Sequence, residues 1–343
     1  MKFGPLPPQD AIGAMAAHSL RAPGLSIRKG ETITEDHARL LREAGIAEIV
    51  AVRLEAGDVP ENEAASLLAQ ASAGEGVRVE PPFTGRANLF AERPGVLIVE
   101  KSAIDRVNMV DEAITFATLA RFKPVVAGEM VATVKIITYA IGEGRLAQAI
   151  EVARAASGAV RVAPYRLARV GIASTLTPAL KPSIVEKTLR ILGERLAPTG
   201  ARVVAETRTP HEAQALAAEI ERLAAGEAEI ILVFGASAVS DRRDVIPAAI
   251  EAVGGEVEHL GMPVDPGNLL LIGRIAGKPV IGAPGCARSP RENGFDWILH
   301  RMLAGLPVTR ADIMGMGVGG LLMEIVSRPQ PRSGEPSGEE PGP

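Results

Sequence analysis

The stretch that decides the fold is Glu229–Gly255, EIILVFGASAVSDRRDVIPAAIEAVGG. The apolar run EIILVF predicts a buried strand that stops at Gly235, and RDVIPAAIEAVGG predicts a helix with Pro247 near its start. A loop of small residues joins them. Such residues let backbone amides approach a ligand, and a helix N-terminus attracts anions. The loop therefore indicates either an anion site or the solvated, aspartate-capped start of a helix.

The charged residues of this loop are the candidates for chemistry. Arg242 and Arg243 are suited to bind phosphate, and Asp241 or Asp244 is suited to hold a magnesium ion against that phosphate. We take Asp241 and Asp244 as candidate catalytic residues, and Asp244 as the candidate metal ligand.

Strands and helices alternate on both sides of this stretch, over residues 166–308. The predicted strands include LARVGIAST, ARVVAET and KPVIGAP, and the predicted helices include SIVEKTLRILGERL, TPHEAQALAAEIERLAAG and PRENGFDWILHRMLAGL. The second of these helices is predicted to begin with Thr209 as N-cap and Pro210 in its first turn, and the last to bury Trp297. The alternation predicts a three-layer α/β domain with a mostly parallel sheet. Ligands bind beyond the carboxyl ends of such strands, where we expect Gly235 and Gly285 to lie side by side.

The remaining segments are less regular. Residues 1–165 predict a smaller mixed α+β region, with a helix from N-cap Thr34 to Gly45 and a polar surface loop at Phe83–Phe90, FTGRANLF. Residues 309–326 form a glycine-rich extension that predicts a tight turn before an apolar strand. Residues 327–343, SRPQPRSGEPSGEEPGP, are rich in Pro, Gly, Ser and Glu, which predicts a disordered tail or a linker.

The composition excludes several classes of protein and kinds of site. The net charge of -4, with no basic block, and an aromatic content of 3% argue against a nucleic-acid-binding protein. The single cysteine excludes an internal disulfide and a multi-cysteine metal site. No apolar run is long enough to span a bilayer, and the N-terminus lacks a signal-peptide pattern, so we expect a cytoplasmic protein. The five scattered histidines predict ordinary surface or core positions.

Four motifs in order resemble one family. GASAVSDRRDVIP, DPGN and APGCARS, together with RVGIASTLTP before them, resemble the molybdopterin-binding domain of molybdenum-cofactor biosynthesis, whose members include molybdopterin adenylyltransferases and molybdotransferases. The whole chain also resembles the molybdopterin-binding half of bacterial proteins that carry a nucleotidyltransferase domain after it. The resemblance implies a molybdopterin or molybdenum-cofactor ligand, with ATP and magnesium as further possibilities.

The resemblance also implies a set of ligand-contacting residues. They are Ser174, Thr175, Gly235, Ala236, Ser237, Ser240, Arg242, Arg243, Pro266, Gly267, Pro284, Gly285, Arg288 and Ser289.

The chain departs from the family's pattern where carboxylates are expected. Ala236 replaces the second glycine of the glycine loop, and Ala287 replaces the second proline of the Pro-Gly loop. Leu176, Thr177 and Pro178 replace a Gly-Asp-Glu run. Only His211 and Glu212 stand where adenylyltransferases have an aspartate before the glycine loop.

Three functions therefore remain open. The first is a transferase of adenylyl or molybdate groups. The second is a non-catalytic module that holds the cofactor for a separate nucleotidyltransferase or molybdoenzyme. The third is a protein similar to nucleotide-pyrophosphate hydrolases. The family resemblance further implies a homo-oligomer, either dimer or trimer.

Overall fold

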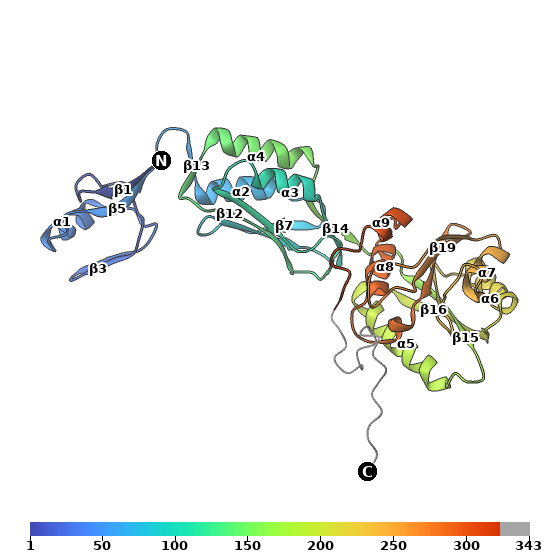
Figure 1. Cartoon of the computed structure of the whole chain (residues 1–343). Helices are drawn as coiled ribbons and strands as arrows, with labels where there is room; N and C mark the ends of the chain where they lie inside the picture. Colours follow the sequence, from blue (N-terminus) through green and yellow to red (C-terminus); the bar gives the residue numbers. More distant parts are fainter. Residues whose placement is uncertain (323–343) are drawn as a thin grey trace, which may run out of the picture. The chain divides into compact units, whose positions relative to one another are not determined.

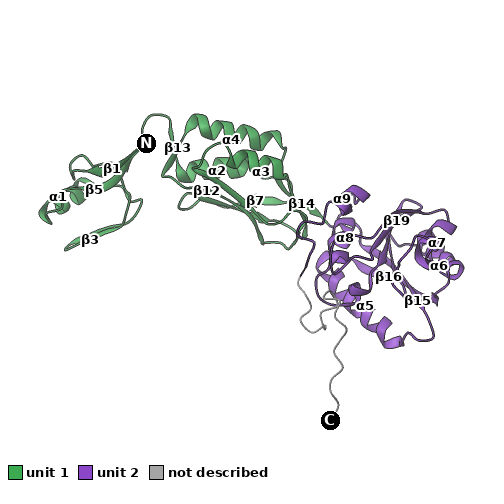
Figure 2. Cartoon of the chain, in the orientation of Figure 1, with its two compact units in different colours: residues 1–164 green, residues 165–343 purple. Residues whose placement is uncertain are grey.

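A computed structural model describes residues 1–322 and divides the chain into two compact units, Met1–Pro164 and a second that begins at Tyr165 (Figures 1 and 2). The tail expected over residues 327–343, and the strand expected after the glycine-rich turn, lie outside the described residues. Within residues 1–322, no helix is long and apolar enough to cross a membrane.

The first unit begins with a small sheet and one helix. Its elements are β1 (Lys2–Leu6), β2 (Met15–Ala16), β3 (Leu20–Ala22), β4 (Leu25–Ile27), α1 (Glu35–Glu43) and β5 (Ile49–Arg53), with sheet order β1-β5-β2. The predicted helix is confirmed: Thr34 caps α1 and forms a capping box with His37, and Gly45 follows the helix at a φ of 71°.

The rest of the first unit consists of antiparallel strands and three helices. The strands are β6 (Asp58–Pro60), β7 (Val77–Val79), β8 (Arg86–Ala91), β9 (Gly95–Val99), β10 (Ile114–Thr118), β11 (Pro124–Val125), β12 (Met130–Ile136), β13 (Ala140–Gly142) and β14 (Val160–Pro164). The helices are α2 (Glu61–Ser72), α3 (Lys101–Asn108) and α4 (Glu143–Ala155). Strands and helices share one apolar core.

The loop expected at Phe83–Phe90 is wrong over most of its length, because β8 begins at Arg86. Ala87, Leu89 and Ala91 alternate into the core while the residues between them are only partly buried. This period of two, paired antiparallel with β12, makes the segment a strand. Only the turn at Phe83–Gly85 keeps the expected loop character.

The second unit contains a six-stranded sheet with the order β16-β15-β17-β20-β19-β18. The strands are β15 (Arg169–Leu176), β16 (Arg202–Pro210), β17 (Ile230–Phe234), β18 (Glu256–Leu260), β19 (Leu271–Ile275) and β20 (Lys278–Ala283). The first four in sheet order run parallel, and β19 is antiparallel to both of its neighbours. The sheet is thus mostly parallel, as expected.

Helices cover both faces of this sheet. The helices are α5 (Pro182–Leu196), α6 (Ala213–Ala225), α7 (Val245–Ala252), α8 (Gly294–Leu303) and α9 (Arg310–Met314), with short 3-10 turns at Ala197–Thr199 and Gly285–Arg288. One apolar core joins α5, α8 and α9 to the sheet, and a second joins α6 and α7 to its other face. The three-layer α/β prediction is confirmed.

Two details of the predicted helices are wrong. Thr209 and Pro210 do not start α6, because they belong to β16, where they pair with Thr175 and Leu176 of β15. Strand pairing therefore outweighs the local capping pattern, and α6 begins at Ala213. Trp297 of α8 is only partly buried, since its indole nitrogen donates to Glu292.

Candidate functional site

The carboxyl ends of three parallel strands meet at one edge of the sheet. In the pairing register Phe234, the last residue of β17, lies between Ser174 of β15 and Ala283 of β20. The loops that follow β17 and β20 therefore start side by side. We call residues 235–244 the glycine loop and residues 284–291 the Pro-Gly loop. The expected proximity of Gly235 and Gly285 is confirmed.

The glycine loop turns tightly at its first residue. A Cβ atom on Gly235 would lie 2.5 Å from the carbonyl oxygen of Ser237, so a side chain there would force the loop to shift. The next residue is fixed from β15, since the Ala236 amide donates to Oγ1 of Thr175 over 2.8 Å. Thr175 is fully buried and Ser174 nearly so, whereas Ser237 is exposed at the tip of the turn.

His211 joins this group, although the sequence interpretation placed it among ordinary histidines. It follows the last residue of β16, and its amide donates to the carbonyl oxygen of Leu176 over 2.9 Å. Its Nδ1 lies 2.8 Å from Oγ1 of Thr175, and its Nε2 lies 3.0 Å from Oγ of Ser237. Its position before the glycine loop was noted from the sequence, but a helix start placed at Thr209 put His211 inside a helix and not directly after a parallel strand.

Arg288 connects the two loops. Its guanidinium donates to the carbonyl oxygen of Gly235 and to Oγ1 of Thr188, each over 2.8 Å, and it lies over the ring of Phe234 at 5.6 Å. Burial lowers the pKa of this guanidinium from its usual range. Arg288, expected to contact a ligand, thus also fixes the spacing of the two loops.

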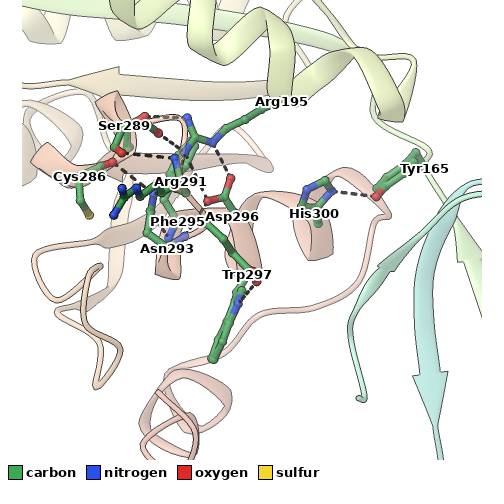
Figure 3. Close-up of polar contacts among 12 residues, drawn as sticks. Tyr165, Arg195, Cys286, Ser289, Arg291, Asn293, Phe295, Asp296, Trp297 and His300 are labelled. Atoms are coloured by element: carbon green, nitrogen blue, oxygen red, sulfur yellow. Dashed lines mark hydrogen bonds and ion pairs between the residues drawn. The ribbon is translucent and has the colours of Figure 1, made fainter. Parts of the chain in front are cut away.

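A second, largely buried arginine, Arg195, holds the Pro-Gly loop from the side of α5. We call its contacts with this loop and with α8 the arginine clamp. Arg195 donates to the carbonyl oxygen of Ala287 over 2.9 Å. It also donates to the carbonyl oxygen of Ser289 over 2.6 Å (Figure 3). Its Nε forms an ion pair with Asp296 of α8 at 2.5 Å, and the two side chains are only 9% and 12% exposed. A bidentate arginine gives both direction and strength to such contacts. Sequence reasoning did not identify Arg195, which is 92 residues from the carbonyl of Ala287 that it contacts.

Asn293 completes this clamp. Its side-chain amide donates to the carbonyl oxygens of Cys286 and Arg291, and its Oδ1 accepts the amide of Phe295 at the start of α8 (Figure 3). The side chain is almost fully buried. The Pro-Gly loop is therefore preorganised by contacts beneath it, while Gly285 is exposed with open space around its Cα.

The DPGN turn packs against the start of the same helix. The carbonyl oxygen of Pro266 accepts the amide of Gly294 over 2.8 Å. Gly267 has a φ of 146°, and a Cβ there would lie 2.9 Å from Cα of Gly294. Both the backbone conformation and the close approach require glycine. The glycine-rich segment borders this turn, because Asp265 pairs with Leu321 in an isolated bridge.

The charged residues of the glycine loop have protein partners. The Asp244 carboxylate caps α7, accepting the amide of Val245 over 2.7 Å and that of Ser240 over 3.1 Å. Arg243 pairs with Asp241 at 2.8 Å, which lowers the pKa of that carboxyl, and the arginine side chain is 92% exposed.

Arg242 donates to the carbonyl oxygen of Val257 in β18. Arg242 is therefore held to an outer strand, away from the three strand ends where the glycine and Pro-Gly loops meet. Across residues 1–322, no three His, Cys, Asp or Glu side chains form a group suited to hold a metal ion.

A cavity of about 310 Å³ lies elsewhere in the second unit. Its walls include Ile272 and Arg274 of β19 and Pro279 at the beginning of β20, together with Met302 and Val308. The beginning of β20 is at the opposite edge of the sheet from the Pro-Gly loop. The cavity is therefore separate from the candidate site.

Comparison with known proteins identifies the domain. Residues 171–305 match the model of a family described as a probable molybdopterin binding domain. No curated protein matches the chain.

Two solved structures resemble the chain. The molybdopterin biosynthesis MoeA protein from Pyrococcus horikosii is 16% identical over 89% of this chain and 75% of that one, with a TM-score of 0.32. Molybdenum cofactor biosynthesis protein B is 15% identical over 41% of this chain and 95% of that one, with a TM-score of 0.31. The family match covers β15 to α8, the segment that carries the glycine, DPGN and Pro-Gly motifs. Residues 171–305 therefore match the probable molybdopterin-binding domain family.

Proposed function

We propose that the second unit binds molybdopterin, or the finished molybdenum cofactor, at the edge formed by the glycine and Pro-Gly loops. The observation that carries this proposal is that the segment matching the molybdopterin-binding family brings its two glycine-containing loops together at the carboxyl ends of β17 and β20. Ligands of open α/β sheets bind at such strand ends.

The chemistry of the two loops supports an anionic ligand. Exposed glycine and serine residues give a phosphate close access to backbone amides, and Arg288 places a positive charge between the loops. The arginine clamp fixes the Pro-Gly loop before any ligand arrives, which reduces the ordering cost of binding.

Group transfer is a second candidate, carried by Asp244. Each oxygen of its carboxylate accepts one amide and keeps a further lone pair, so the residue fits a magnesium ion that is shared with ligand phosphates. With ATP, the reaction would be adenylyl transfer, and with molybdate it would be metal insertion. A nucleotidyltransferase or molybdoenzyme would then receive the product, and a second copy of this chain would form a homo-oligomer.

Calorimetric titration of the full chain with molybdopterin tests the proposed binding. We expect saturable binding at one site per chain, in the presence or absence of ATP and magnesium. Gly235→Ala should reduce the affinity at least tenfold, because its Cβ would displace the loop. Gly193→Ala is the matched control, since a Cβ on that residue of α5 would meet nothing within 4 Å. The absence of heat and of saturation with the wild-type chain would refute the proposal.

Turnover separates the two candidates. Release of pyrophosphate from ATP that requires both molybdopterin and magnesium would establish adenylyl transfer. Binding without such release, and without molybdate incorporation, would assign the chain to cofactor holding.

A further inference from the structure

Thr175, His211 and Ser237 form one hydrogen-bonded row that ends at the glycine loop. The distances are 2.8 Å from Thr175 Oγ1 to His211 Nδ1 and 3.0 Å from His211 Nε2 to Ser237 Oγ. The order resembles the catalytic triad of a serine hydrolase, with Thr175 in the place of the group that orients the base, His211 in the place of the base and Ser237 in the place of the nucleophile. The protonation of the imidazole decides whether Ser237 is a nucleophile or a hydrogen-bond donor.

Thr175 determines that protonation. Its Oγ1 already accepts the amide of Ala236, and its side chain is fully buried, so its own hydroxyl proton needs an acceptor inside the protein. Within residues 1–322, the hydroxyl has one other partner, Nδ1 of His211. Thr175 therefore donates, Nδ1 accepts, and the ring proton of the neutral imidazole is on Nε2.

The consequence for Ser237 is the opposite of activation. Nε2–H of His211 donates to Ser237 Oγ, so the imidazole has no lone pair with which to take the serine proton. The hydroxyl proton of Ser237 is then directed away from the histidine, and Ser237 is exposed at the tip of the loop.

We propose that His211 is a positioning residue, held by Thr175 as the Nε2–H tautomer, which orients the Ser237 hydroxyl as a hydrogen-bond donor to a phosphate oxygen of the ligand. This inference rests on the proposed function for the identity of the ligand, and on hydrogen bonding alone for the orientation of Ser237. The backbone contact between the His211 amide and Leu176 fixes the residue at the end of β15 independently of its ring.

Nitrogen-15 NMR of the histidine rings tests the tautomer without a ligand. We expect the neutral ring of His211 to show a protonated Nε2 and an unprotonated Nδ1, and Thr175→Val to shift that ring towards a mixture of tautomers. A protonated Nδ1 in the wild-type chain would overturn the proposal. Covalent labelling of Ser237 by a fluorophosphonate would also overturn it, because that reaction requires a base.

Binding measurements test the consequence. Ser237→Ala should lower the affinity for molybdopterin about ten- to hundredfold, as expected for one charge-assisted hydrogen bond. His211→Phe should cause a similar loss, and the double variant should lose little more than either single variant. Ser183→Ala, an exposed serine at the start of α5, is the matched control and should bind as the wild type does. Dephosphorylated molybdopterin lacks the phosphate that Ser237 is proposed to contact. It should therefore bind Ser237→Ala, His211→Phe, the double variant, Ser183→Ala and the wild type with the same affinity.

The outcomes separate this inference from the proposed function. If molybdopterin binds the wild type and both single variants equally, the role of His211 is refuted while the binding function stands. If molybdopterin does not bind at all, the binding function is refuted. Inorganic phosphate is then the second probe, with the same variants: the proposal requires a weaker interaction in Ser237→Ala and His211→Phe, and equal binding overturns it.

Discussion

At the residue scale, Asp244 has two roles that mutation separates. Its carboxylate accepts the amides of Val245 and Ser240, so Asp244→Ala should lower the free energy of unfolding by about 1–2 kcal/mol. Asp244→Asn should lower it by less, because its one side-chain oxygen still accepts the amide of Val245 while its NH2 group can no longer accept that of Ser240. If Asp244 also holds magnesium, the Asn variant should lose the increase in molybdopterin affinity that magnesium causes in the wild type. An increase that survives in the Asn variant would assign Asp244 to the cap alone.

Single residues also mark the limit of the sequence interpretation. Gly235 and Gly285 were placed together because parallel strands end at a common edge, which follows from the alternation of strands and helices. The role of His211 was not predicted because a capping pattern at Thr209 and Pro210 is a local signal, whereas the pairing of β16 with β15 is not local. Whether a polar side chain contacts a ligand or a backbone group elsewhere in the protein depends on the folded geometry. Arg242 illustrates this, because it donates to the carbonyl oxygen of Val257.

At the scale of elements, the ion pair between α5 and α8 should contribute far more to stability than the pair within the glycine loop. Arg195 and Asp296 are nearly buried, so Asp296→Ala leaves an uncompensated charge and should cost about 3–5 kcal/mol. Asp241→Ala is the control, because its exposed partner Arg243 remains hydrated, so the free energy of unfolding should stay close to that of the wild type. Urea denaturation measures both. Equal and small losses would show that the clamp is not a stabilising contact.

The elements differ in how well the sequence predicts them. The helices and strands of residues 166–308 have strong apolar periodicity and near-regular alternation, so their type and their layering could be predicted. The short antiparallel strands of the first unit pair across distant parts of the chain, and nothing local to FTGRANLF reveals that β12 is its partner. The clamp by Arg195 is likewise a long-range contact that no linear motif encodes.

At the scale of the whole molecule, the apolar core around Leu89 in the first unit is separate from the two cores of the second unit, so we expect these two parts of the chain to unfold in separate transitions. Leu89→Ala removes a fully buried side chain from the first unit, and Leu232→Ala removes one from the sheet of the second. Each should lower the free energy of unfolding of its own transition by about 2–5 kcal/mol and leave the other unchanged.

The ligand should act on one transition only. Molybdopterin at a hundred times its Kd should raise the free energy of unfolding of the Leu232-sensitive transition by about 2.7 kcal/mol, because binding stabilises only the unit that forms the site. Scanning calorimetry of the full-length variants, with and without the ligand, measures all three effects. A single transition that both substitutions shift would mean that the units unfold together, and stabilisation of the Leu89-sensitive transition would place the ligand in the first unit.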